Sequence, residues 1–314
     1  MVRFVIRRLL QSAVVLLGVT VVVFLLLQMV PGDPVRVALG TRFDPQTYEA
    51  LRARAGLDQP LVAQYFNYLG RALTGDLGVS FRSGRPVTTI VLERLPATLS
   101  LAVTAVLFAV LIAFPLGIVS AIRSGSLVDH AARVFSQIGV SVPDFWMGIM
   151  GILLFAGVLG WLPPSGYVAL TEDPAGWVSH VALPAATVGL VTASILTRFI
   201  RSAMLEVLSE DYVRTAEAKG LRTRVVVLRH VLRNALIPVV TVVAVQLASL
   251  LGGVIVIEVL FAWPGIGRLT YDAVQARDYP VLQGAVLLVA ALFLLINLLV
   301  DILYARLDPR ISVR

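Results

Sequence analysis

Six long stretches without a charged side chain constrain what this sequence can fold into. Each stretch is mostly apolar and is long enough to cross about 30 Å of hydrocarbon, a distance that takes roughly 20 helical residues. They cover residues 9–32, 95–122, 145–171, 174–197, 234–257 and 279–300. Across the chain 58% of the residues are hydrophobic and 14% are charged, which is more apolar surface than a water-soluble core of this size buries. We therefore expect an all-α, polytopic membrane protein with six transmembrane helices.

The third stretch is the least regular of the six because prolines interrupt it. Pro143 precedes it, and Pro163 and Pro164 lie inside it. Proline removes a backbone donor and breaks the hydrogen-bonding pattern of a helix. We expect the third helix to begin near Arg133 and to end before Trp161.

The first stretch raises the question of a cleaved signal peptide. Its apolar core runs for about 20 residues, whereas the core of a secretory signal has roughly 7 to 15. The residues that follow are Pro-Gly-Asp-Pro, at 31–34, where a cleavage site needs small residues. We therefore interpret residues 1–30 as the N-terminus and an uncleaved first transmembrane helix.

The basic residues set the expected orientation in the membrane. Short cytoplasmic loops retain basic residues, and an even number of spans leaves both termini on one side. The two termini and the loops after spans two and four hold sixteen of the 26 lysines and arginines, while most of the others lie at 31–94, in a loop too long for the rule. We expect both termini to face the cytoplasm, and residues 95–314 to form a five-helix transmembrane core with a cytoplasmic loop at about 201–233.

The long outer loop has the sequence pattern of a small helical domain on the extracytoplasmic side. Asp44 can cap a helix that has Pro45 in its first turn and Gly56 as its stop signal. A second helix is predicted from Leu61, because apolar and aromatic residues recur at helical spacing until Gly75. Such a domain either stabilises the outer face as a lid or receives a partner protein.

The largest cytoplasmic loop is divided by Gly220. Glycine disfavours helix interiors and permits a turn, so the expected form is a short helix at 212–219, a bend, and a second, amphipathic helix. The predicted apolar face of the second helix holds Leu228, Val231, Leu232 and Ala235, opposite Arg229 and Arg233. A basic loop of this kind either anchors the protein at the lipid headgroups or docks on a partner.

The order of residues around Gly220 resembles the cytoplasmic signature of permeases in binding-protein-dependent, ATP-driven importers. That signature reads E-A-A, three residues, G, nine residues, and then I-x-L-P. Aligned on Gly220, it places residues 214–216 on the E-A-A positions, and Ala216, Gly220 and Leu232 match strictly. The proline comes five residues later than in the signature, at Pro238, in a form similar to that of the dipeptide, oligopeptide and nickel branch.

Further matches to that branch follow in order along the chain. They are VPGDP (30–34), GLDQPL (56–61), GDLGVSF (75–81), RLPATL (94–99), SVPDFW (141–146), EVLFAWPGIGRL (258–269) and RDYP (277–280). Singly these motifs are weak, but together they make nearly the whole chain similar to a permease subunit of this branch.

The resemblance implies a mechanism and a set of partners. In that family the short helix is a coupling helix, which docks in a groove of a cytoplasmic ATPase and transmits its closure to the membrane spans. The docking residues implied here are Arg214, Thr215, Ala216, Lys219, Gly220, Leu221 and Arg222. The implied partners are a second related permease, two ATPase subunits and an extracytoplasmic solute-binding protein. The implied cargo is a di- or oligopeptide, with nickel, glutathione or another small solute as the alternative.

ATP has to be bound by another chain, because the sequence holds no P-loop. A P-loop needs Gly-Lys-Ser/Thr, whereas Lys219, the only lysine, lies between Ala218 and Gly220. We expect no catalytic residue and no cofactor in this chain, with ATP and Mg²⁺ on the partner ATPases. The sequence has no cysteine, and its three histidines lie fifty residues apart, so no metal site is expected. Nucleic acid is not an expected partner.

Two other classes of protein are compatible with a chain of apolar helices. A secondary transporter works without an ATPase and usually has about ten or more spans with paired broken helices. A purely structural membrane scaffold transports nothing. Co-isolation of ATPase subunits favours the importer, and transport by the chain alone favours the secondary transporter.

Polar side chains within or beside the spans are candidates for a transport pathway. Charge inside a membrane is costly and tends to face a pathway or a partner. The candidates are Glu258, Asp144, Asn297 and Asp301. Glu258 is preferred, because an acid at the outer mouth of span five can meet the amino terminus of a peptide. A structural role is the alternative for all four, for example at the helix break that Pro143 predicts beside Asp144.

Overall fold

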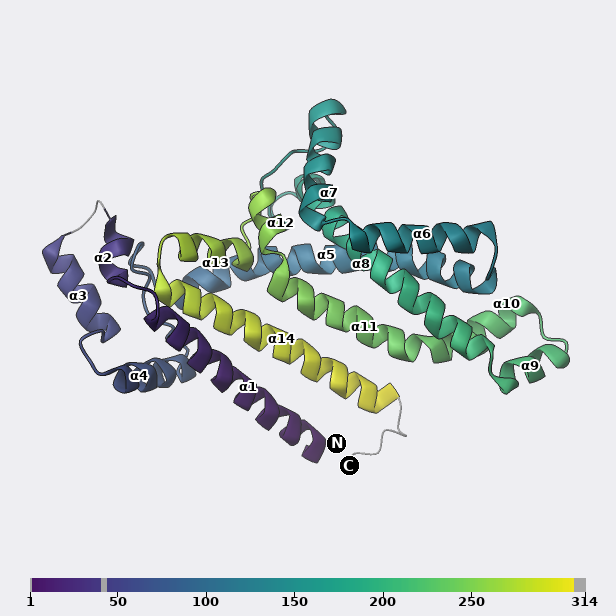
Figure 1. The fold of residues 1–314 in the computed structure, drawn as a ribbon, viewed down its shortest axis with the longest axis horizontal. Helices are drawn as coiled ribbons and strands as arrows, with labels where there is room; N and C mark the ends of the chain where they lie inside the picture. The colour runs from purple at the N-terminus through teal and green to yellow at the C-terminus, as the bar shows by residue number, and fades with distance from the viewer. Residues whose placement is uncertain (1, 41–43, 308–314) are drawn as a thin grey trace. The chain divides into compact units, whose positions relative to one another are not determined.

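The computed structural model describes residues 2–40 and 44–307, and these residues are helical apart from connecting loops and one isolated bridge between Val79 and Pro86 (Figure 1). The elements are α1 (Val2–Gln28), α2 (Pro34–Leu39), α3 (Pro45–Ala55), α4 (Leu61–Leu73), α5 (Val87–Ile122), α6 (Leu127–Ser141), α7 (Asp144–Gly151), η2 (Ile152–Val158), α8 (Pro174–Leu208), α9 (Asp211–Ala218), α10 (Thr223–Val225), η3 (Val226–Val231), α11 (Leu232–Gly253), α12 (Ile255–Leu260), α13 (Ile266–Gln275) and α14 (Tyr279–Leu307). The chain divides into two compact units. The first contains the residues up to Leu99 and Leu251–Leu298, and the second contains Ser100–Leu250 and the residues from Leu299 on.

Four helices are long and apolar enough to cross a membrane. They cover Val5–Gln28, Val87–Ile122, Pro174–Leu208 and Tyr279–Ile302. Two pairs of helices meet the same criterion together but are bent, by 99° between Leu127–Ser141 and Asp144–Val158 and by 49° between Thr223–Leu236 and Pro238–Gly252. By length and composition, the described residues therefore provide four spans, or up to six if each bent pair is one span.

Pro143 lies at the sharper of the two bends. The proline ring leaves no N–H for a helical hydrogen bond and favours an extended backbone at the residue before it. Val142 accordingly has φ −87° and ψ 126°. The prediction of a single third helix that begins near Arg133 is wrong, because two helices meet here at 99° and α6 already begins at Leu127 (Figure 1).

Glycines allow helices of the second unit to pack closely. A Cβ on Gly139 would lie 1.9 Å from Ser194 Oγ, and one on Gly189 would lie 2.7 Å from the ring of Phe108. Small residues at such crossings are typical of helix pairs in membranes. Beside them, buried aliphatic side chains of α5, α8, α9, η3 and α11 form one cluster. The loop between α8 and α11 packs on this aliphatic cluster through side chains of α9 and η3.

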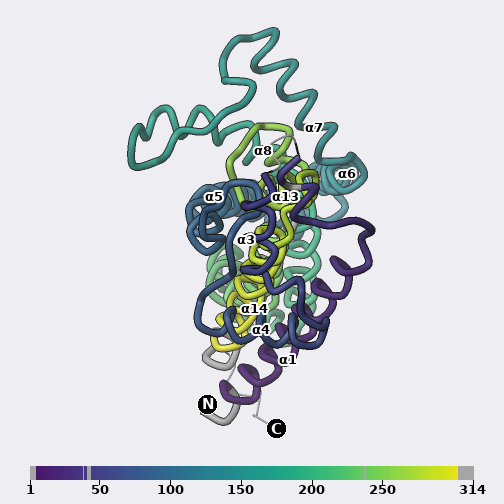
Figure 2. The backbone as a smooth tube through the Cα atoms, turned by 90° about the vertical axis from the view of Figure 1, so that its left-hand side faces the viewer, coloured from purple at the N-terminus to yellow at the C-terminus, as the bar shows by residue number. Residues whose placement is uncertain are grey.

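The outer loop forms α2, α3 and α4 within the first unit, and Figure 2 shows these helices facing the viewer. The predicted start of α3 is confirmed, because Asp44 accepts a hydrogen bond from the Thr47 amide at 2.8 Å and Pro45 is the first residue of the helix. Gly56 ends α3 with φ 68° and ψ 24°, a left-handed conformation that glycine adopts without steric penalty. The second predicted helix is α4, which ends at Leu73.

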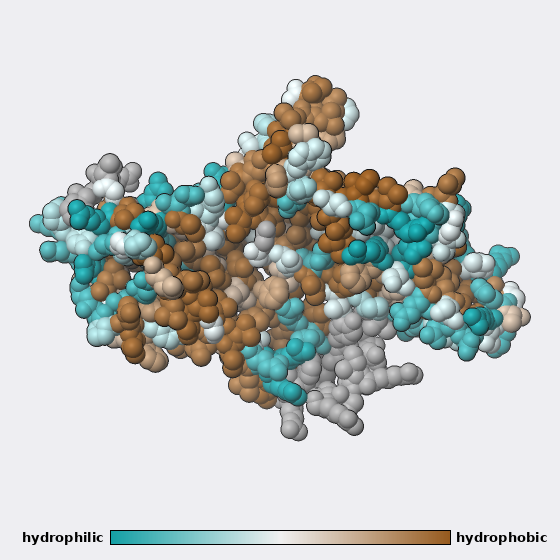
Figure 3. Space-filling model, in the orientation of Figure 1, coloured by the Kyte–Doolittle hydropathy of each residue, from teal (hydrophilic) through white to brown (hydrophobic). Residues whose placement is uncertain are grey.

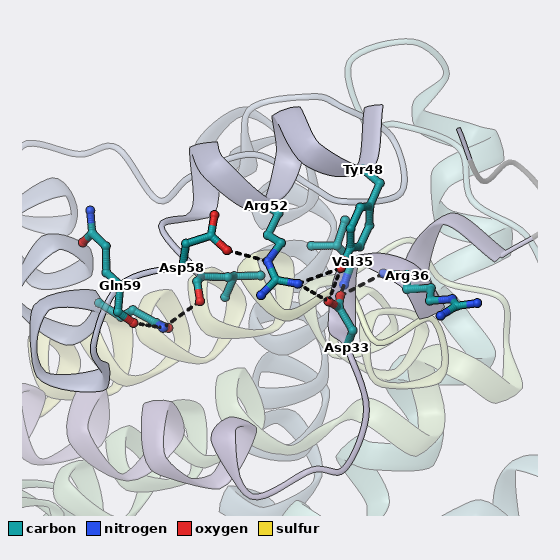
Figure 4. A network of polar contacts seen from close by, with 9 residues as sticks. Asp33, Val35, Arg36, Tyr48, Arg52, Asp58 and Gln59 are labelled. Atoms are coloured by element: carbon teal, nitrogen blue, oxygen red, sulfur yellow. Dashed lines mark hydrogen bonds and ion pairs between the residues drawn. The ribbon is translucent and has the colours of Figure 1, made fainter. Parts of the chain in front are cut away.

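A polar network joins the start of the outer loop to α3 (Figure 4). The Asp33 carboxylate caps α2 by accepting hydrogen bonds from two backbone amides at 2.9 and 3.1 Å. It also accepts a 2.6 Å hydrogen bond from the Tyr48 hydroxyl and lies 3.3 Å from the Arg52 guanidinium. Burial raises the pKa of Asp33, but these hydrogen bonds and the Arg52 charge together hold its pKa below the ordinary value. Arg52 also pairs with Asp58 at 2.6 Å, so the VPGDP and GLDQPL motifs meet here.

A second clamp joins the GDLGVSF motif to the RDYP motif. The buried Asp278 carboxylate accepts hydrogen bonds from Ser80 Oγ at 2.5 Å and from the Phe81 amide at 3.1 Å. Arg277 in turn donates from Nη1 to the Pro31 carbonyl at 2.9 Å. Segments 198 residues apart in the sequence are therefore held together within the first unit.

Candidate functional site

The segment between α8 and α11 forms the candidate functional site. α9 is followed by Gly220, α10 and the π-helical η3 before α11 begins. In Figure 1 this loop extends beyond the ends of α8 and α11, the two long helices that carry it. The predicted short helix at 212–219 with a bend at Gly220 is confirmed, with each helix boundary shifted by one residue.

Gly220 ends α9 in a Schellman motif. Its amide donates to the Glu217 carbonyl at 2.9 Å, and the Leu221 amide donates to the Ala216 carbonyl at 3.3 Å. This pair of hydrogen bonds requires a left-handed residue between them, and Gly220 has φ 76°. A Cβ added at Gly220 would meet no atom within 4 Å. The backbone conformation, and not a lack of space inside the chain, therefore calls for glycine.

α9 is fixed to the second unit through one of its faces. Val213 and Ala216 are buried in the aliphatic cluster beside the valines of η3. Asn234 donates from Nδ2 to the Tyr212 hydroxyl at 2.8 Å and so ties α9 to the first turn of α11. Asp211 places negative charge in the first turn of α9, where the helix dipole favours it. The opposite face of α9 stays open.

Six of the seven docking residues that the resemblance implies are exposed, two on the open face of α9 and four in the segment that follows it. They are Arg214, Thr215, Lys219, Gly220, Leu221 and Arg222. Ala216 is the exception, because it is 8% exposed and packs into the aliphatic cluster. Ala216 therefore seats α9 and offers little surface to a partner.

The exposed charged side chains at 211–229 are mainly basic, with Asp211 and Glu217 as the acidic exceptions. Among the described residues no carboxylate forms an ion pair with Lys219 or Arg222, and Arg214 lies 3.7 Å from Asp211 in an exposed pair. Leu221 adds an apolar side chain that is 41% exposed. Ammonium and guanidinium groups donate charge-assisted hydrogen bonds, so this surface suits a partner that offers carboxylates.

The predicted apolar face of the second helix is wrong at one position. Val231 and Ala235 are buried as expected, but Leu228 is 51% exposed, and Val226 and Val227 are buried instead. The cause is η3, whose i→i+5 hydrogen bonds widen the turn and rotate the side chains relative to an α-helical wheel. A sequence pattern read at the α-helical period cannot anticipate this rotation.

A buried ion pair that sequence reasoning missed supports the helices beneath the loop. Asp129 is 1% exposed, and its carboxylate accepts hydrogen bonds from Arg201 Nε at 2.6 Å and Nη2 at 2.9 Å. Ser120 Oγ and the Gly125 amide donate to the same carboxylate at 2.6 and 2.9 Å. The available signal was the S-x-x-D spacing of Ser126 and Asp129, typical of a helix start, and Ser126 caps α6. Together these bonds join α5, α6 and α8.

Glu258, the preferred pathway candidate, is enclosed within the first unit. It is 1% exposed, and its carboxylate accepts hydrogen bonds from Thr98 Oγ1 at 2.9 Å and from the Arg268 amide at 2.8 Å. A Cβ on Gly265 would lie 2.0 Å from a carboxylate oxygen, so the backbone packs directly against this group. Burial raises the pKa of Glu258, against the effect of its hydrogen-bond donors. This geometry favours the structural alternative, in which Glu258 joins the EVLFAWPGIGRL and RLPATL motifs.

The other pathway candidates lie in two different helices. Asp144 begins α7 directly after Pro143, as the structural alternative predicts, and accepts a hydrogen bond from the Phe145 amide at 2.7 Å. Asn297 and Asp301 lie in α14 and are partly buried. The described part of the chain holds no group of three or more His, Cys, Asp or Glu side chains that could bind a metal ion. A pathway role for Asp144 stays a prediction.

The fold and the loop define a class of protein, namely a helical membrane protein that presents a short helix, followed by basic residues, between two long helices. A family model described as "Binding-protein-dependent transport system inner membrane component" matches residues 113–313. A second model, for the N-terminal part of such membrane components, matches residues 1–102. The chain belongs to this family of binding-protein-dependent transport system inner membrane components.

Named relatives are similar to the chain over nearly their whole length. The chain is 42% identical over 335 residues to the dipeptide transport system permease protein DppB of Escherichia coli (strain K12), with 99% of both chains covered. It is 44% identical over 332 residues to the di/tripeptide transport system permease protein DppB of Pseudomonas aeruginosa (strain UCBPP-PA14), again over 99% of both. It is also 44% identical over 311 residues to the glutathione transport system permease protein GsiC of Escherichia coli (strain K12), with 99% of both covered.

A solved structure has a similar fold. It is a crystal form of the inward-facing MetNI methionine ABC transporter, with a TM-score of 0.57 and 19% identity, and the match covers 70% of this chain and 96% of that chain. At this identity the likeness concerns the fold alone. The expected all-α membrane fold and the expected family are both confirmed.

Proposed function

We propose that this chain forms half of the translocation pathway of an ATP-driven importer for di- or oligopeptides. The observation that carries the proposal is the identity of 42% and 44%, over 99% of the chain, with permease proteins named for dipeptide and di/tripeptide transport. The similarity extends over the spans, the outer loop and the basic loop alike, so it concerns the whole subunit and not one module.

In this proposal α9 is the element that docks on a cytoplasmic ATPase subunit. Arg214, Lys219 and Arg222 supply charge-assisted contacts, and Leu221 supplies an apolar one. The buried face of α9 packs on the aliphatic cluster, which also contains side chains of α8 and η3. A close-packed core transmits a displacement of one element to its neighbours instead of absorbing it. Closure of the ATPase therefore moves α8 and η3 through α9.

The same proposal assigns partners and an orientation. A second related permease completes the pathway, two ATPase subunits bind ATP and Mg²⁺, and an external solute-binding protein delivers the peptide. The absence of a P-loop around Lys219 supports an ATPase on separate chains. The excess of basic residues in the loop after α8 and near both termini supports a cytoplasmic location for all three.

Uptake of a radiolabelled dipeptide into proteoliposomes tests this function. The purified complex is reconstituted with ATP inside and the solute-binding protein outside. We expect ATPase subunits to co-purify with the chain and uptake to require both ATP and the binding protein. Uptake by this chain alone, without an ATPase, would instead support a secondary transporter and would refute the proposal.

Glutathione import is the second candidate function. It is favoured by the 44% identity to a glutathione transport system permease protein over 99% of the chain, which equals the identity to the di/tripeptide permease. Glutathione is itself a tripeptide with one side-chain amide linkage. Competition experiments separate the two candidates. If unlabelled dipeptides abolish the uptake of labelled dipeptide and glutathione has no effect on it, the result favours dipeptide import. If labelled glutathione is taken up and dipeptides do not reduce this uptake, the result favours glutathione import.

A further inference from the structure

α4 of the outer loop carries apolar residues on the side that faces away from the protein. Val62, Phe66 and Leu73 recur at i, i+4 and i+11, a spacing that puts them on one face of a helix. Their side chains are 69%, 63% and 81% exposed. A helix on the surface of a water-soluble domain has the opposite arrangement, with its apolar stripe turned toward the core.

Two polar residues of α4, Gln64 and Arg71, are partly buried and turned toward the protein. Gln64 donates to the Gln59 carbonyl at 2.8 Å, and Arg71 donates to the Arg54 carbonyl at 3.3 Å. Burial raises the pKa of Tyr68 to about 12, since a buried phenol resists ionisation. At these positions the polarity of α4 is inverted relative to that of a helix in water, whereas Asn67 is exposed as in such a helix.

α4 packs against α1, the first candidate span (Figure 1). The hydroxyls of Tyr65 and Thr20 lie 3.0 Å apart, and the rings of Tyr65 and Phe24 meet edge to face with 5.4 Å between their centroids. At 1.5 Å per residue, Thr20 lies about 12 Å before Gln28, the last residue of the span. A hydrocarbon core of about 30 Å, centred on Val5–Gln28, includes both Thr20 and Phe24.

The helix α1, against which α4 packs, also exposes apolar side chains. Only 11% of the α1 span is buried inside the protein. Val22, Leu25 and Leu26, near the C-terminal end of α1, are 54%, 53% and 58% exposed, and Figure 3 shows apolar residues over the visible side of this helix. In water the two helices would both expose large apolar side chains, an arrangement that soluble surfaces avoid where such side chains gather.

We propose that α4 lies in the membrane interface, with Val62, Phe66 and Leu73 inserted among the acyl chains of the leaflet that surrounds the C-terminal end of α1. Amphipathic helices in an interface bury their apolar face about 5–10 Å into the boundary between headgroups and acyl chains, a depth that the contact between Tyr65 and Thr20 requires. The outer loop is thus partly embedded in lipid. This placement is independent of the cargo, so it can fail while the proposed function stands.

Spin labels on single cysteines test this placement, because the described chain and the full sequence contain no cysteine. Phe66→Cys places the label on the stripe, and Asn67→Cys places it on the next residue, which is exposed but lies outside the stripe. Val14→Cys on α1 is the lipid reference, and Ser83→Cys in the outer loop is the water reference, since both positions are exposed. The complex is reconstituted in phosphatidylethanolamine and phosphatidylglycerol liposomes without binding protein, and EPR measures collisions with oxygen and with a water-soluble nickel chelate.

Oxygen concentrates in lipid and the chelate in water, so their collision ratio reports the surroundings of each label. We expect the oxygen-to-chelate ratio at Phe66→Cys to approach that at Val14→Cys and to exceed that at Ser83→Cys, with Asn67→Cys between them. A ratio at Phe66→Cys equal to that at Ser83→Cys would overturn the proposal. Protection that arises only when the binding protein is added would also overturn it and would assign the stripe to that partner. Val62→Cys repeats the measurement if the Phe66 variant folds poorly.

Discussion

Replacing Gly220 with valine tests whether the bend after α9 is part of the coupling mechanism. An L-residue in the left-handed conformation pays roughly 1–2 kcal/mol, and strained positions cost up to about 3 kcal/mol. For valine we expect a cost near the upper end of this range, because its side chain branches at Cβ. Two hydrogen bonds depend on this conformation, from the amides of Gly220 and Leu221. No atom lies within 4 Å of the added Cβ, so the whole effect comes from the backbone and not from a clash inside the chain.

The magnitude follows from this cost. With RT of about 0.6 kcal/mol, 1–3 kcal/mol shifts the population of the docking-competent loop by roughly five- to hundredfold. We expect Gly220→Val to insert normally, because the basic residues that set the topology remain. Dipeptide uptake and binding-protein-stimulated ATP hydrolysis should fall by up to that factor, with or without loss of the ATPase subunits. Reconstituted complexes allow membrane insertion, ATPase retention and uptake to be measured on one preparation.

Asparagine at the same position is the matched control. Asparagine tolerates the left-handed conformation far better than a β-branched residue, so Gly220→Asn should keep most of the coupled uptake. Failure of both variants would indicate that a partner surface packs against Gly220. Normal coupled uptake by Gly220→Val would refute the docking role of α9. In that case the loop would be a headgroup anchor, and neutralising Arg222, Arg229 and Arg233 should disturb insertion instead.

Three further predictions follow from the structure. Asp129→Asn should lower the stability of the second unit by about 3 kcal/mol, the low end for a broken buried pair because Arg201 is 22% exposed, and thermal unfolding in detergent measures it. No loss of stability would show that the ion pair contributes nothing net. Thr223→Cys should resist an impermeant maleimide applied to intact cells while Ser83→Cys reacts with it, and the reverse labelling would overturn the orientation. Glu258→Ala should reduce the amount of folded chain, because it leaves buried donors unsatisfied; a selective loss of uptake at normal abundance would reinstate the pathway role.

The ends of helices could be predicted from the sequence because their signals are local. Asp44 and Gly56 bound α3 as the cap and stop residues of a helix, within a few positions of the residues that they bond. Gly220 is another local signal, since only its own φ and the two neighbouring carbonyls are involved. The apolar stretches likewise predict where helices cross a membrane, because each crossing is a property of one continuous segment.

Contacts between distant segments could not be predicted in the same way. Thr98 and Glu258 are 160 residues apart, and Asp129 and Arg201 are 72 apart, so nothing in the local pattern identifies the partner. The proline at position 143 indicates a break but not its angle of 99°. The exposure of Leu228 depends on a π-helical turn, which changes the period that the pattern assumes.

The division of charge within the chain bears on where cargo selectivity resides. The carboxylates of Asp33, Glu258 and Asp278 all accept hydrogen bonds inside the first unit, and the last two are almost fully buried. If one of these carboxylates bound a peptide amino terminus instead, its present hydrogen-bond donors would be left unpaired in a buried site. Each unpaired donor would cost about 1–3 kcal/mol of stability. The exposed basic groups of the loop carry no such cost. An importer that receives its cargo from a selective external protein needs no strong charged site in the permease, so the proposed function accommodates acids that serve the scaffold.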